Sequence, residues 1–149
     1  MSQRISSLPF SPPSYTDQEA NAVFDCVKRG WTGTGPKTKE FEQKFSAYKG
    51  CSHAAGLSSC TAALFLSLKA LNIKQGDEVI TSAMTFCSTI NVILHCGATP
   101  VICDVDPISK NICVDEIAAK ITANTRAIIP VHYAGFPCEM DLIIDIAER

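Results

Sequence analysis

Four short apolar segments alternate with helical patterns along this chain, and this alternation constrains the fold more than any other feature. The segments predict strands over 53–57, 78–81, 99–103 and 126–131, and the stretches that follow them predict helices over 61–71, 85–95, 114–121 and from 140 onward. Strands that alternate with helices form a largely parallel sheet with right-handed crossovers. The expected fold class is therefore α/β, with a mainly parallel sheet covered by helices on both faces.

The N-terminal part predicts an arm and two further helices. Residues 1–15 are rich in proline and predict an extended N-terminal arm. Thr16 and Glu19 form a capping-box pattern that begins the first helix, and Gly50 ends the second. No linker follows, so we expect one domain over 16–149. The chain ends inside a predicted helix without a cap, which predicts that this domain is incomplete and the chain truncated.

The composition excludes several classes of protein. Apolar residues make up 46%, charged residues 19%, and the net charge is −2, so bulk charge attracts neither nucleic acid nor an anionic membrane. No secretory signal and no membrane-spanning run are visible, and we expect a cytoplasmic protein. The eight cysteines form no C-x-x-C pair. They are interpreted as small, buried thiols in a reducing cytoplasm, and no metal site is expected.

Ligands of open parallel sheets bind beyond the carboxyl ends of the strands, so the strand-to-helix turns are the candidate sites. The turn at 58–63 (SSCTAA) combines small side chains, hydroxyls and free N–H groups at a helix start. Such a turn cradles a phosphate, or it is an ordinary helix cap. Phe86 follows the next strand; an aromatic there can lie on a planar ring, although packing in the core is the commoner role.

Two later turns carry ionisable side chains. Asp104 and Asp106 are two residues apart, as in some metal and acid–base sites, but the turn formers over 107–111 favour loop capping. His132 follows the last predicted strand. A histidine in that place is either functional or a hydrogen-bonded part of the scaffold, and both interpretations stay open.

Seven segments occur together in a characteristic order. They include TGPK (34–37), SSCTAAL (58–64), GDEVI (76–80), TF (85–86), GATPV (97–101), DVD (104–106) and IIPVH (128–132). In order and spacing they resemble the DegT/StrS family of sugar-nucleotide aminotransferases, which depend on pyridoxal phosphate (PLP). The resemblance runs from about Leu8 to Arg149. It implies that the chain is the N-terminal portion of the large domain of a fold-type-I PLP-transferase.

The resemblance also implies which residues bind the cofactor. Thr61 and Ala62, with Cys60 beside them, match the turn that donates hydrogen bonds to the PLP phosphate. Phe86 matches the aromatic residue that stacks on the pyridine ring.

Thr34, Gly35 and His132 match positions near the substrate. Many members have Gly-Gln after the histidine segment, whereas this chain has Gly135-Phe136, which puts a polar contact from position 136 in doubt.

The resemblance implies that no catalytic residue lies in this chain. The carboxylate that holds the pyridinium nitrogen is expected on a strand just after Arg149, and the lysine that forms the Schiff base lies further on. The complete enzyme would be a homodimer that moves an amino group from glutamate to a nucleotide-linked keto sugar.

Such sugars enter surface polysaccharide, lipopolysaccharide or antibiotics. Three alternatives stay open: a PLP-dependent sugar dehydratase of the same family, a non-catalytic remnant that pairs with a partner subunit, and an enzyme with Cys60 as nucleophile.

Overall fold

The computed structural model describes residues 11–149, so most of the expected arm over 1–15 lies outside the described residues. The chain divides into two compact units, the first ending at Gly56 and the second beginning at Leu57. Each unit is built from its own local signals.

Two helices make up the first unit, as predicted. They are α1 (Asp17–Lys28) and α2 (Pro36–Lys49). The capping box at α1 is confirmed, since the Thr16 hydroxyl accepts from the Gln18 N–H and the Thr16 N–H donates to Glu19 at 2.7 Å. Gly50 ends α2 with a φ of 68°, a left-handed conformation that glycine adopts without steric cost. No residue of either helix is buried within the described chain.

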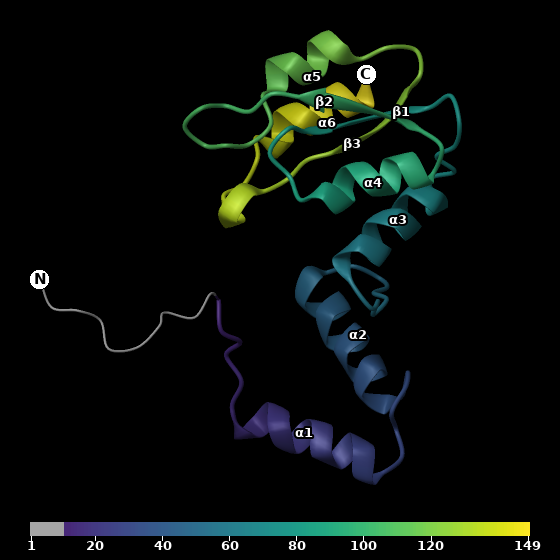
Figure 1. Cartoon of the computed structure of the whole chain (residues 1–149), viewed down its shortest axis with the longest axis vertical. Helices are drawn as coiled ribbons and strands as arrows, with labels where there is room; N and C mark the ends of the chain where they lie inside the picture. The colour runs from purple at the N-terminus through teal and green to yellow at the C-terminus, as the bar shows by residue number, and fades with distance from the viewer. Residues whose placement is uncertain (1–10) are drawn as a thin grey trace, which may run out of the picture. The chain divides into compact units, whose positions relative to one another are not determined.

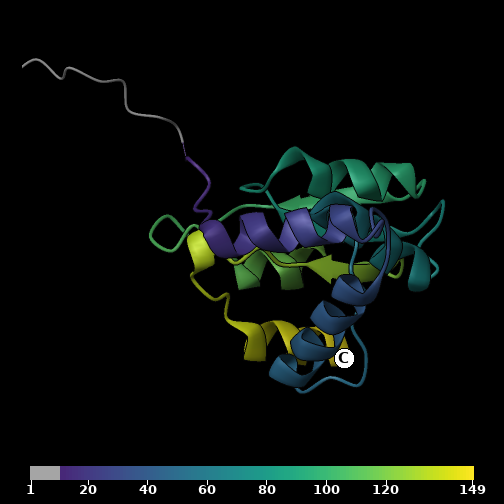
Figure 2. The same ribbon diagram turned by 90° about the horizontal axis from the view of Figure 1, so that it is seen from below.

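The second unit is a parallel sheet between two layers of helices, which confirms the expected α/β class. Its strands are β1 (Glu78–Ser82), β2 (Thr99–Cys103) and β3 (Thr125–Ile129), in the order β2-β1-β3. Its helices are α3 (Cys60–Ala70), α4 (Cys87–His95), α5 (Val114–Lys120), α6 (Met140–Glu148) and the 3₁₀ turn η1 (Tyr133–Gly135). Figures 1 and 2 show α4 on one side of the strands and α5 and α6 on the other.

The central strand β1 is buried on both faces. Successive side chains of a strand point to opposite faces, so Val79 enters the core formed with α3 and α4, while Ile80 enters the core formed with α5 and α6. Both are fully buried, and each contributes about 1.5–3 kcal/mol by leaving water. The buried Thr81 hydroxyl donates to the Ile129 carbonyl at 3.0 Å. This two-sided burial explains why the adjacent residues Val79 and Ile80 are both apolar instead of one being polar.

The predicted strand over 53–57 is wrong: residues 11–149 form three strands where the sequence predicted four. The segment HAAGL is mostly exposed, and the Gly56 N–H donates to the Glu42 carboxylate at 2.8 Å instead of to a neighbouring strand. An extended segment becomes a strand only where a neighbour completes its hydrogen bonds. No described strand does so here, and two alanines and a glycine bury too little apolar surface to compensate.

The loop after β2 confirms the capping interpretation of its acidic residues. One oxygen of Asp106 accepts the N–H groups of Ile108 and Ser109 at 3.0 and 2.7 Å, and these bonds, with that to Ser109 the largest, lower the pKa of Asp106. Asp104 accepts the N–H of Val105 at 2.8 Å. Both carboxylates therefore serve the turn.

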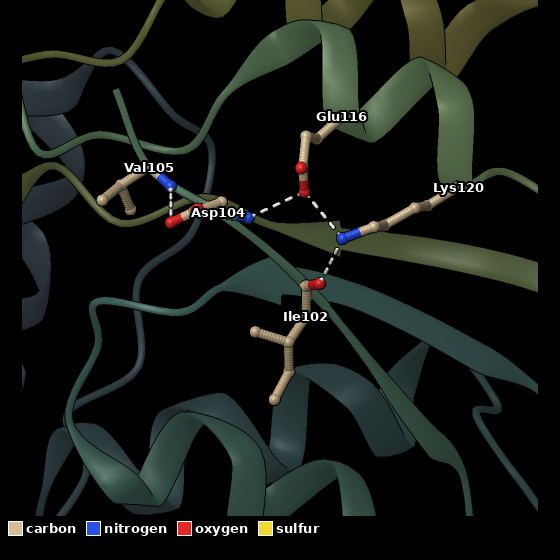
Figure 3. A network of polar contacts seen from close by, with 5 residues as sticks. All are labelled: Ile102, Asp104, Val105, Glu116 and Lys120. Carbon is tan, nitrogen blue, oxygen red and sulfur yellow. Dashed lines mark hydrogen bonds and ion pairs between the residues drawn. The ribbon is translucent and has the colours of Figure 1, made fainter. Parts of the chain in front are cut away.

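A polar network joins α5 to the end of β2 (Figure 3). The Lys120 amine donates to the Ile102 carbonyl at 2.8 Å and to the Glu116 carboxylate at 2.6 Å, and the same Glu116 oxygen accepts the Asp104 N–H at 2.9 Å. The hydrogen bond between the two side chains is the main cause that lowers the pKa of Glu116 and raises the pKa of Lys120. The network therefore holds the helix to the strand through both charged groups.

We predict that Lys120→Met lowers the thermal unfolding midpoint at pH 7, because it removes the amine that contacts both Ile102 and Glu116. The folded pKa of Glu116 is lowered, so its contribution is present above the unfolded value of 4.5 and is lost as the pH falls through the folded value. The difference in thermal unfolding midpoint between wild type and Lys120→Met should therefore be smaller at acidic pH. Thermal melts at pH 7 and pH 3 test this, with Lys69→Met in the last turn of α3 as the control. An equal difference at both pH values would contradict the prediction.

Candidate functional site

The start of α3 presents hydrogen-bond donors to solvent. Ser59 is the N-cap, and its hydroxyl accepts the Ala62 N–H at 3.1 Å. Within residues 11–149, the N–H groups of Cys60 and Thr61 have no acceptor. The side chains of Cys60 and Thr61 are exposed, and the helix dipole places partial positive charge at this end. Of the three predicted N–H donors, those of Cys60 and Thr61 are available to a ligand, whereas that of Ala62 already donates to the Ser59 hydroxyl.

Ser59 belongs to the quoted motif but is not among the predicted binding residues. Its position directly before an apolar helix is the signal that identifies an N-cap. The cap leaves Thr61 with both an N–H and a hydroxyl for a ligand. The Cys60 thiol forms no hydrogen bond to a basic side chain within the described part of the chain, so no general base is seen beside it there.

Phe86 does not pack in the core. Its side chain is 75% exposed, and it belongs to neither core cluster of the second unit. It is the N-cap residue of α4, which therefore begins at Cys87, two residues later than predicted. The turn before it is rigid, because the Ala83 N–H donates to the Cys103 carbonyl at 2.8 Å and the Met84 N–H donates to the Ser82 hydroxyl at 3.1 Å. A firmly held turn thus carries an open aromatic face.

His132 is both exposed and hydrogen-bonded. Its Nδ1 accepts the Cys138 N–H at 3.0 Å, so the neutral ring carries its proton on Nε2. The two open interpretations thus coexist: one nitrogen is used by the scaffold, and Nε2–H remains available as a donor.

Two of the candidates follow strands whose carboxyl ends lie at one edge of the sheet. β1 and β3 are parallel neighbours, so their carboxyl ends lie at the same edge, and Phe86 and His132 follow these ends. Helix α3 packs against α4, and Figure 1 shows both helices with their N-terminal ends toward the side on which β1 ends. Donors for a phosphate and a flat apolar surface therefore occur in one unit, a combination that fits a planar ring bearing a phosphate.

Thr34 and Gly35 belong to the first unit. Gly35 is the N-cap residue of α2, and an added Cβ there would lie 2.7 Å from an atom of the Trp31 ring, so a larger residue would force that ring to move. Gly35 and Trp31 line a cleft of about 500 Å³, together with Arg29. Thr34 does not line it. Within the first unit, Gly35 therefore lies beside an aromatic ring.

Known proteins are similar to this chain in sequence and in fold. The model of the DegT/DnrJ/EryC1/StrS aminotransferase family matches residues 13–149. The spore coat polysaccharide biosynthesis protein SpsC of Bacillus subtilis is 46% identical over 142 residues, which cover 95% of this chain and 36% of SpsC. The PLP form of a putative sugar aminotransferase, Spr1654 from Streptococcus pneumoniae, is 42% identical with a TM-score of 0.92 and covers 96% of this chain.

The pyridoxamine phosphate (PMP) form of the same Spr1654 protein has a TM-score of 0.91. The chain spans 36% of the length of both SpsC and Spr1654. Sequence, fold and the match along nearly the whole chain agree, and the chain belongs to the DegT/DnrJ/EryC1/StrS aminotransferase family.

Proposed function

We propose that the protein carrying this chain is a PLP-dependent aminotransferase that moves an amino group from glutamate to a nucleotide-linked keto sugar. The observation that carries the proposal is the likeness to Spr1654 in both its PLP and its PMP form. These two cofactor forms differ by the amino group that transamination transfers. The polysaccharide role named for SpsC supports a sugar acceptor, destined for polysaccharide, lipopolysaccharide or a related amino sugar.

The residues of the second unit would bind and orient the cofactor. The N–H groups of Cys60 and Thr61 and the Thr61 hydroxyl would hold the phosphate, with Ala62 completing the turn. Phe86 would cover one face of the pyridine ring and exclude water from it. PLP, when bound, supplies the electron-accepting ring that carries the amino group. His132 would donate its Nε2–H toward the substrate, and Thr34 and Gly35 would lie on the substrate loop.

The remaining chemistry is proposed for residues outside these 149. We assign no catalytic residue in this chain, and the lysine and carboxylate of the family pattern are expected after Arg149. The complete enzyme is proposed to be a cytoplasmic homodimer whose partners are the nucleotide sugar and glutamate. No helix of the described residues has the length and apolar character needed to cross a membrane.

The first prediction concerns the phosphate. Thr61→Val keeps the shape of the side chain but removes the hydroxyl, and a hydrogen bond to a charged group contributes about 1.5–3 kcal/mol. PLP affinity in the complete protein should therefore fall roughly ten-fold or more. Absorbance titration with PLP measures this, and Thr61→Ser is the matched control that keeps the hydroxyl. Equal PLP affinity in Thr61→Val and wild type would remove Thr61 from the site.

The second prediction concerns the ring. Phe86→Ala and Phe86→Leu should weaken PLP binding, whereas Phe86→Tyr and Phe86→Trp should retain it, because only the last two keep a flat face. Since Phe86 is 75% exposed, all four variants should keep their stability to within about 0.5 kcal/mol. Cofactor titration alongside urea unfolding separates the two effects. A Phe86→Leu protein that binds PLP like wild type would exclude stacking.

The third prediction concerns covalent chemistry. When residues 1–149 are purified, mixed with PLP and reduced with borohydride, no single lysine should be labelled, and glutamate should not aminate a keto sugar. The proposed attachment lysine lies elsewhere in the protein, and covalent PLP catalysis depends on it. Peptide mapping by mass spectrometry gives the answer, with the complete protein as the positive control. Stoichiometric labelling of one lysine of this chain would disprove the proposal that the attachment lysine lies outside these 149 residues.

A further inference from the structure

Asn111 is a buried polar residue whose side chain holds another loop. It is 5% exposed and lies at the end of the loop after β2. Its amide nitrogen donates to the carbonyls of Phe136 and Pro137 at 3.1 and 2.9 Å, and its amide oxygen accepts the Tyr133 N–H at 3.0 Å. If the amide were reversed, its oxygen would face two carbonyl oxygens and its nitrogen would face the Tyr133 N–H. Only the observed orientation therefore satisfies all three hydrogen bonds.

The backbone of Asn111 is itself fixed. Its carbonyl accepts the Asp106 N–H at 2.9 Å. The next residue, Ile112, pairs with Val105 and is buried in the core formed with α5 and α6. Because the backbone of Asn111 is held next to a core residue, its side chain has a fixed position and can fix the loop that it contacts.

The contacted loop, 132–137, needs an external constraint. Ala134 has a φ of 51° and Gly135 a φ of 84°, and a left-handed alanine persists only where surrounding structure enforces it. The loop is exposed throughout and contributes no residue to either core cluster of the second unit. At its end, the buried Cys138 donates its N–H to His132 Nδ1. The hydrogen bonds to Asn111 therefore supply the constraint that hydrophobic packing does not.

We propose that Asn111 is a positioning residue: it fixes the loop 132–137 so that His132 is held through Nδ1 and presents Nε2–H at the carboxyl edge of the sheet. The catalytic meaning of this arrangement rests on the proposed function, which puts the substrate at that edge. The dependence of the loop on Asn111 rests only on the contacts described above.

The direct test is amide hydrogen exchange, measured by NMR on the complete protein. Asn111→Leu removes all three hydrogen bonds, and the isosteric Asn111→Asp removes both donors should leucine prevent folding. We expect the amides of Tyr133 and Cys138 to exchange about five-fold faster or more, while the amide of Ile80 in β1 stays unchanged. Asn124→Asp makes the same chemical change on an exposed loop and should alter neither.

The nitrogen signals of the imidazole provide a second readout. In wild type, His132 Nδ1 should show the signal of an acceptor nitrogen, and in both Asn111 variants this signal should move toward that of a free imidazole. Exchange that accelerates equally at Ile80 would show a general loss of stability, and unchanged exchange at Tyr133 and Cys138 would show that the loop holds itself. Either result overturns the proposal.

Kinetics distinguish this proposal from the proposed function. If Asn111 acts through His132, Asn111→Leu and His132→Ala should each raise the KM for the nucleotide sugar without changing PLP affinity, and the double variant should be no worse than His132→Ala alone. Additive losses would overturn action through His132. A His132→Ala enzyme with unchanged KM would remove His132 from the substrate site, while the exchange result would still decide whether Asn111 holds the loop.

Discussion

The second unit depends on the burial of β1 between two helical layers and between two parallel neighbours. Val79 and Ile80 fill opposite cores. Every residue of β1 pairs with β2, and the first four, 78–81, also pair with β3, with one irregularity beside Glu78. A strand held on four sides cannot shift its register without moving apolar side chains into water or polar groups into the core. The turn over 83–85 follows directly from this fixed strand, so Phe86 can have a defined position although its ring is exposed.

The sequence predicts those elements whose stability comes from their own residues. The capping box at Thr16, the strand with the apolar pair Val79 and Ile80, and the glycine that ends α2 all depend on local residues, and each was confirmed. The segment 53–57 failed because strand formation depends on a neighbour that its own residues do not specify. The apolar pattern of that segment was real, but a pattern indicates a preference for burial and not the presence of a partner.

The candidate site shows the same division. Residue types and their place after predicted strands selected the turn at 58–63, Phe86 and His132, and the family resemblance singled out Thr61 within that turn. They could not show that Ser59 would occupy the Ala62 N–H or that Phe86 would lie outside the core, because both outcomes depend on the backbone path through each turn. Asn111 was interpreted only as a turn former, since the carbonyls that it contacts lie more than twenty residues away in the sequence.

The strand order β2-β1-β3 has a consequence for synthesis of the chain. β1, the central strand, is the first of the three to leave the ribosome, whereas the Thr81 hydroxyl bonds to a carbonyl 48 residues later. Pairing of this kind is slow because the intervening chain must first be ordered. Until α5, β3 and α6 emerge, the face of β1 that carries Ile80 faces solvent. Chaperones that recognise extended apolar segments should therefore bind the nascent chain on this face, in the interval between translation of β2 and of α6.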